Sequence, residues 1–386
     1  MRAACLLLSA SLALPFQQAE LGRGLDHFYN LEFDQAIGIF TGLTERHPQE
    51  VRYQNNLAQA ILFRAMLKAG ALESELVTGG NSFLRREKMN PTPEEQRRFD
   101  AAVSTAMKLA QARLDKDPDD RSGLYDLGVA YGMRANYNFL VRKAWMDSLR
   151  DATAGRKLHN RLSELEPAMV DAELMQGAHD YVVGSLPWYY KFLGFLAGIR
   201  GDKDKGIATL QRVAEKGERN RADAAILLAT IYRRERRAAD AVPLLNDLIR
   251  QFPRNYLLRL ELSQMYSDLG EKEQALAAIA AVERMEFPDL PAAKIHYFRG
   301  NLLFWYDDLE LAVASLRKAT AEAGELDLNT GVLSWMRLGQ TYDLLGRRSE
   351  AHAAYRSAMG YAPDSEVAKE SEGYLRSSYQ RSRKPR

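Results

Sequence analysis

The sequence is poor in the residues that usually carry covalent cross-links or chemistry. Its 386 residues include a single cysteine, Cys5, so a disulfide within the chain is excluded. The six histidines are scattered, and no two of them have the i, i+4 spacing of a helical zinc site. The sequence also contains no phosphate-binding loop and no dinucleotide fingerprint. We therefore predict no metal, no cofactor and no enzymatic activity.

The chain also has no large excess of positive or of negative charge. The chain has 53 lysines and arginines against 51 aspartates and glutamates, which gives a formal net charge of +2. Binding to nucleic acid normally needs a concentrated basic face, so we predict no nucleic-acid partner. Hydrophobic residues make up 46% of the chain and charged residues 27%. This composition is typical of a folded protein and excludes disorder along the whole chain.

The N-terminus lacks a hydrophobic run long enough to span a bilayer. Arg2 provides a positive start, and the apolar stretch from Cys5 to Phe16 is 12 residues long. A transmembrane helix needs about 20 residues, whereas a signal peptide has a shorter apolar core. The pattern predicts a signal peptide over residues 1–19, cleaved after Ala19, and a protein exported to the periplasm or cell envelope. An uncleaved anchor and an ordinary first helix are the alternatives.

What the sequence does contain is a repeat, which is clearest near the C-terminus. Apolar residues at i, i+3, i+4 and i+7 form one stripe on a first helix, and small residues allow a second helix to approach closely. A proline then ends the second helix. The spacing matches a tetratricopeptide repeat and is carried by Trp335, Leu338, Gly339, Tyr342, Ala351, Tyr355, Ala358 and Pro363.

The same pattern recurs upstream. Tyr232 and Tyr266 are 34 residues apart, which is the period of this repeat. We predict four regular tetratricopeptide repeats over residues 221–363 and a capping helix over 364–379. A solenoid needs such a cap because its last repeat otherwise exposes a stacking face. A basic disordered tail is predicted for residues 380–386.

The N-terminal half is less regular. Gly24 and Phe40 fit one helical hairpin, and later hairpins over residues 20–220 have helices longer than the repeat requires. Loops are expected around Gly79 and at residues 90–93, where turn residues cluster. No segment bounded by turns has the alternating pattern of a strand. The predicted fold is all-α, a right-handed α-solenoid of tetratricopeptide-like hairpins.

The middle of the chain contains a pattern that a plain repeat does not need. It consists of Gly184, Ser185, Leu186, Pro187, Trp188, Phe192, Gly198, Gly201, Asp202, Lys203, Gly206 and Leu210. The pattern resembles the inclusion-body clearance family and its animal tetratricopeptide outer-membrane relatives, over about a third of the chain. The resemblance implies a helical repeat protein associated with membranes or protein deposits, and it carries over no catalytic residue.

Two alternatives to a plain scaffold arise in the same region. The segment from Tyr181 to Ile199 is largely apolar, so it could contact a membrane or lipid, although buried half-helices broken at Pro187 explain its glycines and lysine. A peripheral membrane contact is therefore kept as an alternative function. His179 and Asp180, beside Tyr181, are the candidate site of an unrecognised enzyme. Neighbours in a helix point about 100° apart, which disfavours that pair.

A binding groove is predicted from the faces of the first helices. Positions opposite the packed stripe should line the concave side of the solenoid. Aromatic anchors and amides at these positions suit an extended peptide or a helix, although Tyr297 and Trp305 could instead pack between repeats. The sequence thus predicts a non-catalytic scaffold that binds a protein or peptide through Arg233, Gln264, Tyr297, Asn301, Phe304, Trp305, Met336 and Gln340.

Overall fold

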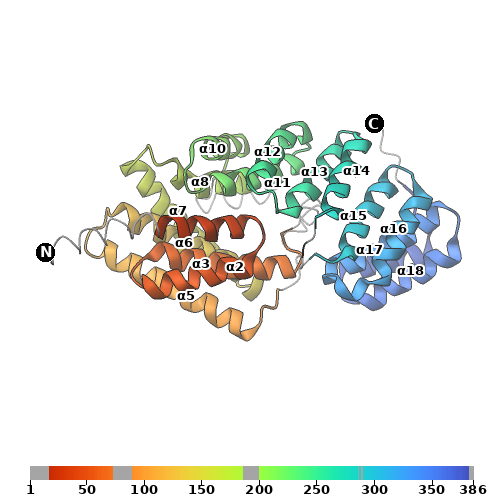
Figure 1. The fold of residues 1–386 in the computed structure, drawn as a ribbon, viewed down its shortest axis with the longest axis horizontal. Helices are drawn as coiled ribbons and strands as arrows, with labels where there is room; N and C mark the ends of the chain where they lie inside the picture. The colour runs from red at the N-terminus through yellow and green to blue at the C-terminus, as the bar shows by residue number, and fades with distance from the viewer. Residues whose placement is uncertain (1–16, 73–88, 186–199, 286, 288–289, 382–386) are drawn as a thin grey trace. The chain divides into compact units, whose positions relative to one another are not determined.

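The computed structural model describes residues 17–72, 89–185, 200–285, 287 and 290–381. These residues form helices joined by short connections and contain no strand (Figure 1). The prediction of an all-α solenoid is confirmed for this part of the chain. Residues 1–16, which hold most of the predicted signal, and the loop around Gly79 lie outside the described residues.

The chain forms two compact units. The division falls after Glu235, inside the first of the four regular repeats predicted from sequence. Unit 1 takes its described residues from within Met1–Met66, Glu75–Glu235 and Arg250–Asn255, and unit 2 from within Leu67–Ser74, Arg236–Ile249 and Tyr256–Arg386.

Unit 1 contains a helix over residues 17–29, followed by a succession of further helices. Adjacent helices along the chain pack against each other, notably α6 against α7 and α8 against α10. The elements are α2 (Phe33–Arg46), α3 (Val51–Lys68, mostly in this unit), α5 (Pro93–Leu114), α6 (Arg121–Tyr137), the π-helix η2 (Asn138–Arg142), α7 (Trp145–Leu165), the 3₁₀ helix η3 (Val170–Glu173), α8 (Leu174–Gly184), α10 (Lys203–Lys216) and α11 (Arg221–Arg234).

Unit 2 contains the regular hairpins. Its helices pack in pairs, α13 with α14, α15 with α16 and α17 with α18, and α19 packs on the last pair. The elements are α12 (Ala238–Gln251, mostly in this unit), α13 (Tyr256–Asp268), α14 (Lys272–Glu283), α15 (Ala292–Trp305), α16 (Leu309–Ala321), the 3₁₀ helix η4 (Ala323–Glu325), α17 (Leu328–Leu344), α18 (Arg348–Tyr361) and α19 (Glu366–Arg376).

Glycines in the hairpins face aromatic rings, as the repeat pattern requires. A Cβ atom added to Gly339 on α17 would lie 2.6 Å from a ring carbon of Tyr355 on α18. One added to Gly24 would lie 2.5 Å from the ring of Phe40. Both distances are far shorter than a van der Waals contact, so any larger residue would push the paired helices apart. The predicted close approaches are therefore confirmed.

Helices α3 and α5 form a long hairpin, and contacts at the start of the second helix, α5, link it to the first. The sequence predicts a loop at residues 90–93, and α5 begins there with Pro93 in its first turn. Thr92 caps the helix by accepting from the backbone N–H of Glu95, whose side chain bonds back to the Thr92 N–H at 2.8 Å. Glu95 also pairs with Arg64 of α3 at 3.0 Å, so the cap is linked to the first helix of the hairpin.

Helices α8 and α10 approach each other through their backbones. A Cβ atom on Gly206 would lie 2.4 Å from the backbone nitrogen of Tyr181. One on Gly184 would lie 2.3 Å from the backbone nitrogen of Lys203. Here the obstacle is main chain, which cannot move aside as a side chain can. The glycines of the central segment thus set the distance between two helices.

A short segment after α12 returns to the N-terminal helices within unit 1. Arg254 forms ion pairs with Asp26 at 2.6 Å and with Glu32 at 2.7 Å. Its hydrogen bond lowers the pKa of Glu32 below the ordinary value. The ring of Phe252 stacks on that of Tyr29 at 4.8 Å between centroids. We call residues 250–255 the clasp, because their contacts join residues that lie more than 220 positions apart in the sequence.

The C-terminal cap is shorter than predicted. Helix α19 starts after the N-cap Ser365 and ends at Arg376, whereas the sequence predicts a helix to residue 379 and disorder from 380. Ser377 has extended backbone angles, and the N–H of Tyr379 bonds to the Asp343 carboxylate at 2.7 Å. Arg381 also makes specific contacts in unit 2, described below. The tertiary hydrogen bonds of Tyr379 and Arg381 therefore stabilise this part of the chain more than a continuation of α19 would.

His159 is buried between α6 and α7, and this predicts a pH-dependent stability. Its Nε2 lies 3.0 Å from the carbonyl oxygen of Tyr125, and burial lowers the pKa of His159 below the ordinary 6.5. The folded chain therefore takes up this proton at a lower pH than the unfolded chain does, so stability falls as the pH drops below about 6.5. Denaturant titrations should show that wild type loses more stability than a His159→Gln variant between about pH 7.5 and about pH 5.5. An equal pH dependence in the two proteins would contradict this assignment.

Candidate partner-binding surface

The eight predicted groove residues differ in how far solvent reaches them. Trp305 at the end of α15 is 52% exposed, and Arg233 is partly exposed. Arg233 lies in unit 1, whereas the other seven lie in unit 2. The remaining six side chains are buried: Gln264, Tyr297, Asn301, Phe304, Met336 and Gln340.

The burial has a simple origin in the way the helices stack. Helix α15 contacts not only its own partner α16 but also α13 and α17. The side of α15 that faces away from α16 is therefore covered by neighbouring first helices, and Tyr297 and Asn301 are enclosed there. The alternative in which Tyr297 packs among the repeats fits this placement. Partner binding by the six buried residues stays a prediction, and Trp305 offers the exposed surface.

Phe304, Trp305 and Arg337 form one cluster, which we call the Trp305 platform. The two aromatic rings meet edge to face, with centroids 5.1 Å apart. The guanidinium of Arg337, on α17, lies 4.4 Å from the Phe304 ring centroid and 4.9 Å from that of Trp305. Arg337 is fixed further by a hydrogen bond to the Gln340 side chain at 2.7 Å. The platform thus combines an exposed indole with a positioned cation.

Residues 377–381, which we call the C-terminal strap, lie against this platform. The Arg381 guanidinium is 4.8 Å from the Phe304 ring centroid and 5.9 Å from that of Trp305. Its Nη2 donates to the backbone carbonyl of Phe304, and its Nη1 pairs with Asp307 at 2.8 Å. The Tyr379 ring lies 5.9 Å from that of Phe304. Sequence patterns give no signal for these contacts, which join positions more than 70 residues apart.

Asp343 anchors the start of the strap. Its side chain is fully buried and receives two hydrogen bonds from Arg348, at 2.7 and 3.0 Å. The Tyr355 hydroxyl donates to it at 2.8 Å, and the Tyr379 N–H donates at 2.7 Å. Burial, together with the bond to Asp343, raises the pKa of Tyr355 well above its ordinary value. One carboxylate therefore joins α17, α18 and the strap.

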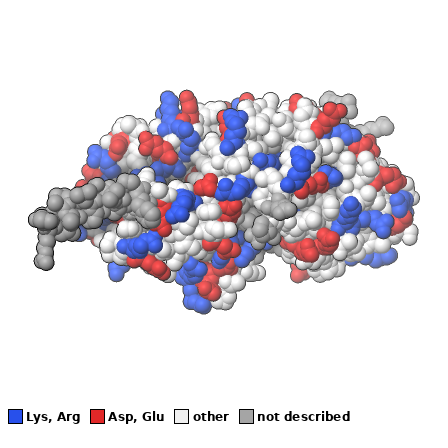
Figure 2. Space-filling view, in the orientation of Figure 1, with Lys and Arg blue, Asp and Glu red and all other residues white. Residues whose placement is uncertain are grey.

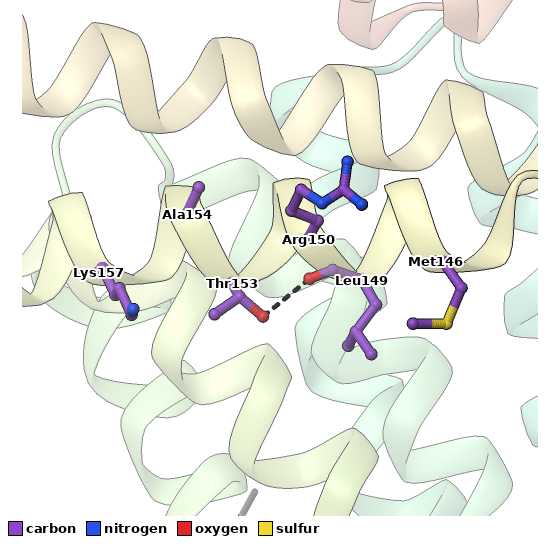
Figure 3. Close-up of a pocket in the computed structure, with 6 residues that line it drawn as sticks. All are labelled: Met146, Leu149, Arg150, Thr153, Ala154 and Lys157. Atoms are coloured by element: carbon purple, nitrogen blue, oxygen red, sulfur yellow. Dashed lines mark hydrogen bonds between the residues drawn. The ribbon is translucent and has the colours of Figure 1, made fainter. Parts of the chain in front are cut away.

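A second exposed apolar surface lies on α7 in unit 1. Trp145, Met146 and Leu149 are all exposed, and Met146 reaches 72%. A hollow of about 370 Å³ lies along one face of this helix, and the side chains that line it are drawn in Figure 3. The Thr153 hydroxyl does not face a ligand, because it donates to the Leu149 carbonyl at 2.7 Å. This surface was not predicted from the sequence, although apolar residues at i, i+1 and i+4 at the start of the helix are a signal for it.

The predicted candidates for chemistry, His179, Asp180 and Tyr181, lie on α8. The Nδ1 of His179 is 3.7 Å from a carboxylate oxygen of Asp180, and burial lowers the pKa of His179. Tyr181 is buried and donates to Glu235 at 3.0 Å instead. Within the described ranges, no three His, Cys, Asp or Glu side chains are grouped to hold a metal ion.

The apolar segment predicted between Tyr181 and Ile199 is described only as far as residue 185, where α8 has just ended. In the part of the chain that the structure covers, no helix is both long and apolar enough to cross a membrane. Basic and acidic side chains are interspersed on the face shown in Figure 2. This mixture agrees with the small formal net charge.

Comparisons with known proteins identify repeats in both units. A family model described as tetratricopeptide repeat matches residues 21–77 and 199–256, and a second of the same description matches residues 332–365. The second match contains the repeat recognised at Trp335. No curated protein matches the sequence. These findings support tetratricopeptide repeats and do not support the narrower resemblance to the inclusion-body clearance family.

Solved structures similar to this chain are distant from it in sequence. The APC/C hetero-tetramer Cut9–Hcn1 is 11% identical with a TM-score of 0.48, over 89% of this chain and 52% of that chain. This chain thus spans about half the length of that relative. Yeast Tom70 is 12% identical with a TM-score of 0.41, over 94% and 95%. YrrB, a tetratricopeptide repeat protein with an unusual peptide-binding site, is 13% identical with a TM-score of 0.33, over 68% and 97%.

Proposed function

We propose that the protein is a non-catalytic scaffold that binds a protein or peptide partner at the Trp305 platform of unit 2. The observation that carries the proposal is the exposed Trp305 beside the positioned guanidinium of Arg337. Tryptophan and arginine dominate the energetics of protein interfaces, because each combines a large contact area with a directed polar group. Helical repeats hold such groups on a rigid frame, which limits the entropy lost on binding.

The proposal assigns no catalysis. His179 and Asp180 place an imidazole near a carboxylate, but no nucleophile is assigned to act with them. The fold of the described residues supports a scaffold, since tetratricopeptide arrays present extended surfaces rather than enclosed pockets.

We propose further that the protein acts outside the cytoplasm, in the periplasm or cell envelope. The support is the short apolar core from Cys5 to Phe16 after Arg2. Sequencing the N-terminus of the native protein checks this: we expect it to begin near Glu20. An intact Met1 on a cytoplasmic protein would contradict the export proposal.

Replacing Trp305 with alanine should sharply reduce partner capture. Interface hot spots cost about 2 kcal/mol or more on truncation, so we expect the affinity for the partner to fall about thirtyfold or more, with a corresponding loss in the amount captured from a cell-envelope fraction. Trp145→Ala is the matched control, because Trp145 is similarly exposed but lies on α7 in unit 1. Thermal melts of both variants should stay near that of wild type, since both side chains are exposed.

The control also tells where a partner binds. A protein lost with Trp305→Ala and kept with Trp145→Ala supports the platform. Loss with Trp145→Ala alone would move the binding surface to α7 and reject the platform. An unchanged set of captured proteins in both variants would reject both surfaces.

A further inference from the structure

The C-terminal strap contacts the Trp305 platform through the kinds of interaction that a bound peptide would use. Arg381 offers its guanidinium to the aromatic rings and donates to the backbone carbonyl of Phe304. Tyr379 offers a ring and a backbone N–H, which bonds to Asp343. Between them, Gln380 is exposed. The strap therefore lies as an extended segment with two anchors separated by one residue.

We propose that the strap is an internal ligand of the platform that competes with the partner, and that the partner carries the same pair of anchors. This inference rests on the proposed function and deepens it. The partner is then an extended peptide segment with an aromatic residue followed two positions later by an arginine. The aromatic residue takes the place of Tyr379, and the arginine takes the place of Arg381 between the platform and Asp307.

The charges at the platform favour this partner over an acidic one. Asp307 receives the Arg381 guanidinium at 2.8 Å, and the Asp343 carboxylate receives the Tyr379 N–H. The Phe304 carbonyl is a further acceptor. These acceptors call for donors on the ligand, and the faces of aromatic rings attract a cation. An acidic peptide would meet Arg337 but would face both carboxylates, so it fits less well.

Because the strap is covalently attached to α19, a few contacts are enough for it to occupy the Trp305 platform. A strap that follows α19 directly is held near the platform at an effective concentration in the millimolar range, so weak contacts suffice for occupancy. If about a tenth of the molecules have the strap released, the apparent affinity for a free partner falls about tenfold. Removing one anchor of the strap should release the strap and raise the apparent affinity for a free partner by the same factor.

The test uses the full chain labelled with ¹⁵N at tryptophan, with the Trp305 indole signal assigned through Trp305→Phe. We expect Arg381→Ala to shift the Trp305 signal and to leave those of Trp145 and Trp335 in place. Arg376→Ala is the matched control, because Arg376 is exposed on α19 and pairs with Glu372 of the same helix at 3.1 Å. Of the four tryptophan signals, it should leave those of Trp145, Trp305 and Trp335 in place.

A blocked peptide with the sequence of residues 377–381 is then titrated to about 10 mM, the upper range of effective concentrations for a short tether. We expect it to return the Trp305 signal of the Arg381→Ala protein toward its wild-type position, and to bind wild type about tenfold more weakly. The same peptide with alanine in place of its arginine should not restore the signal.

Several outcomes would overturn the inference. One is a Trp305 signal that Arg381→Ala does not move, which would mean that the strap is not on the platform. Two others are that the peptide binds equally well to wild type and to the Arg381→Ala protein, or that it binds to neither of them. If partner capture falls with Trp305→Ala and is not raised by Arg381→Ala, the proposed function survives and the competition fails. If the peptide results hold but Trp305→Ala loses no partner, the strap is a bound cap and the proposed function fails.

Discussion

Replacing Gly206 with alanine should lower the free energy of unfolding by about 3 kcal/mol, the upper end of the usual cost of overpacking. The added methyl would lie 2.4 Å from the backbone nitrogen of Tyr181 and 2.8 Å from the carbonyl oxygen of Gly177. Neither atom belongs to a flexible side chain, so α8 and α10 would have to separate. Chemical denaturation of the full chain, followed by far-UV circular dichroism, measures the effect.

Gly38→Ala provides the control with the opposite sign. Gly38 is exposed on α2, and nothing lies within 4 Å of the position that its Cβ would take. Alanine favours a helix over glycine by about 1 kcal/mol, so this variant should be slightly more stable than wild type. Similar stabilities for the Gly206 and Gly38 variants would show that the close approach of α8 and α10 is not as described.

The second large effect is expected at Asp343. Replacing it with alanine removes a fully buried carboxylate and leaves the Arg348 guanidinium, the Tyr355 hydroxyl and the Tyr379 N–H without their acceptor. Loss of one member of a buried ion pair usually costs 3–5 kcal/mol, and because Arg348 is about one third exposed we expect about 3 kcal/mol. Denaturant titration again measures the change.

Glu350→Ala is the comparison for an exposed ion pair. Glu350 lies on α18 and pairs with Arg347 at 2.9 Å, with both side chains well exposed. Exposed pairs contribute little because solvent screens them, so its loss should leave the free energy of unfolding close to that of wild type. An Asp343→Ala variant as stable as Glu350→Ala would contradict the central role of Asp343 in joining α17, α18 and the strap.

The hairpins could be predicted from the sequence because their determinants are local. Gly339 and Tyr355 are 16 positions apart, and the repeat period fixes both their spacing and their packing. The same holds for Gly24 with Phe40. The π-helix at Asn138–Arg142 was not predicted, since no pattern in the composition of that segment distinguishes it from the end of an α-helix.

The exposure of the groove could not be predicted in the same way. A helical wheel tells which residues of α15 face away from α16, but not that α13 and α17 cover that side. Tyr297 and Phe304 were therefore assigned to a surface and are buried, whereas Trp305 keeps its exposure because it ends the helix. The strap is harder still, because its contact with Phe304 depends on how the chain turns after Arg376.

The clasp has a consequence for the order in which the protein folds. Helical repeats form contacts between neighbours, so an array can fold progressively as the chain leaves the ribosome. Arg254 and Phe252 break this locality, since Asp26, Tyr29 and Glu32 must wait for residues more than 220 positions later. At ordinary rates of synthesis this delay is on the order of ten seconds or more. During that time the acidic and aromatic side chains of the first hairpin are open to solvent and to chaperones, and they are covered only when residues 250–255 have been synthesised.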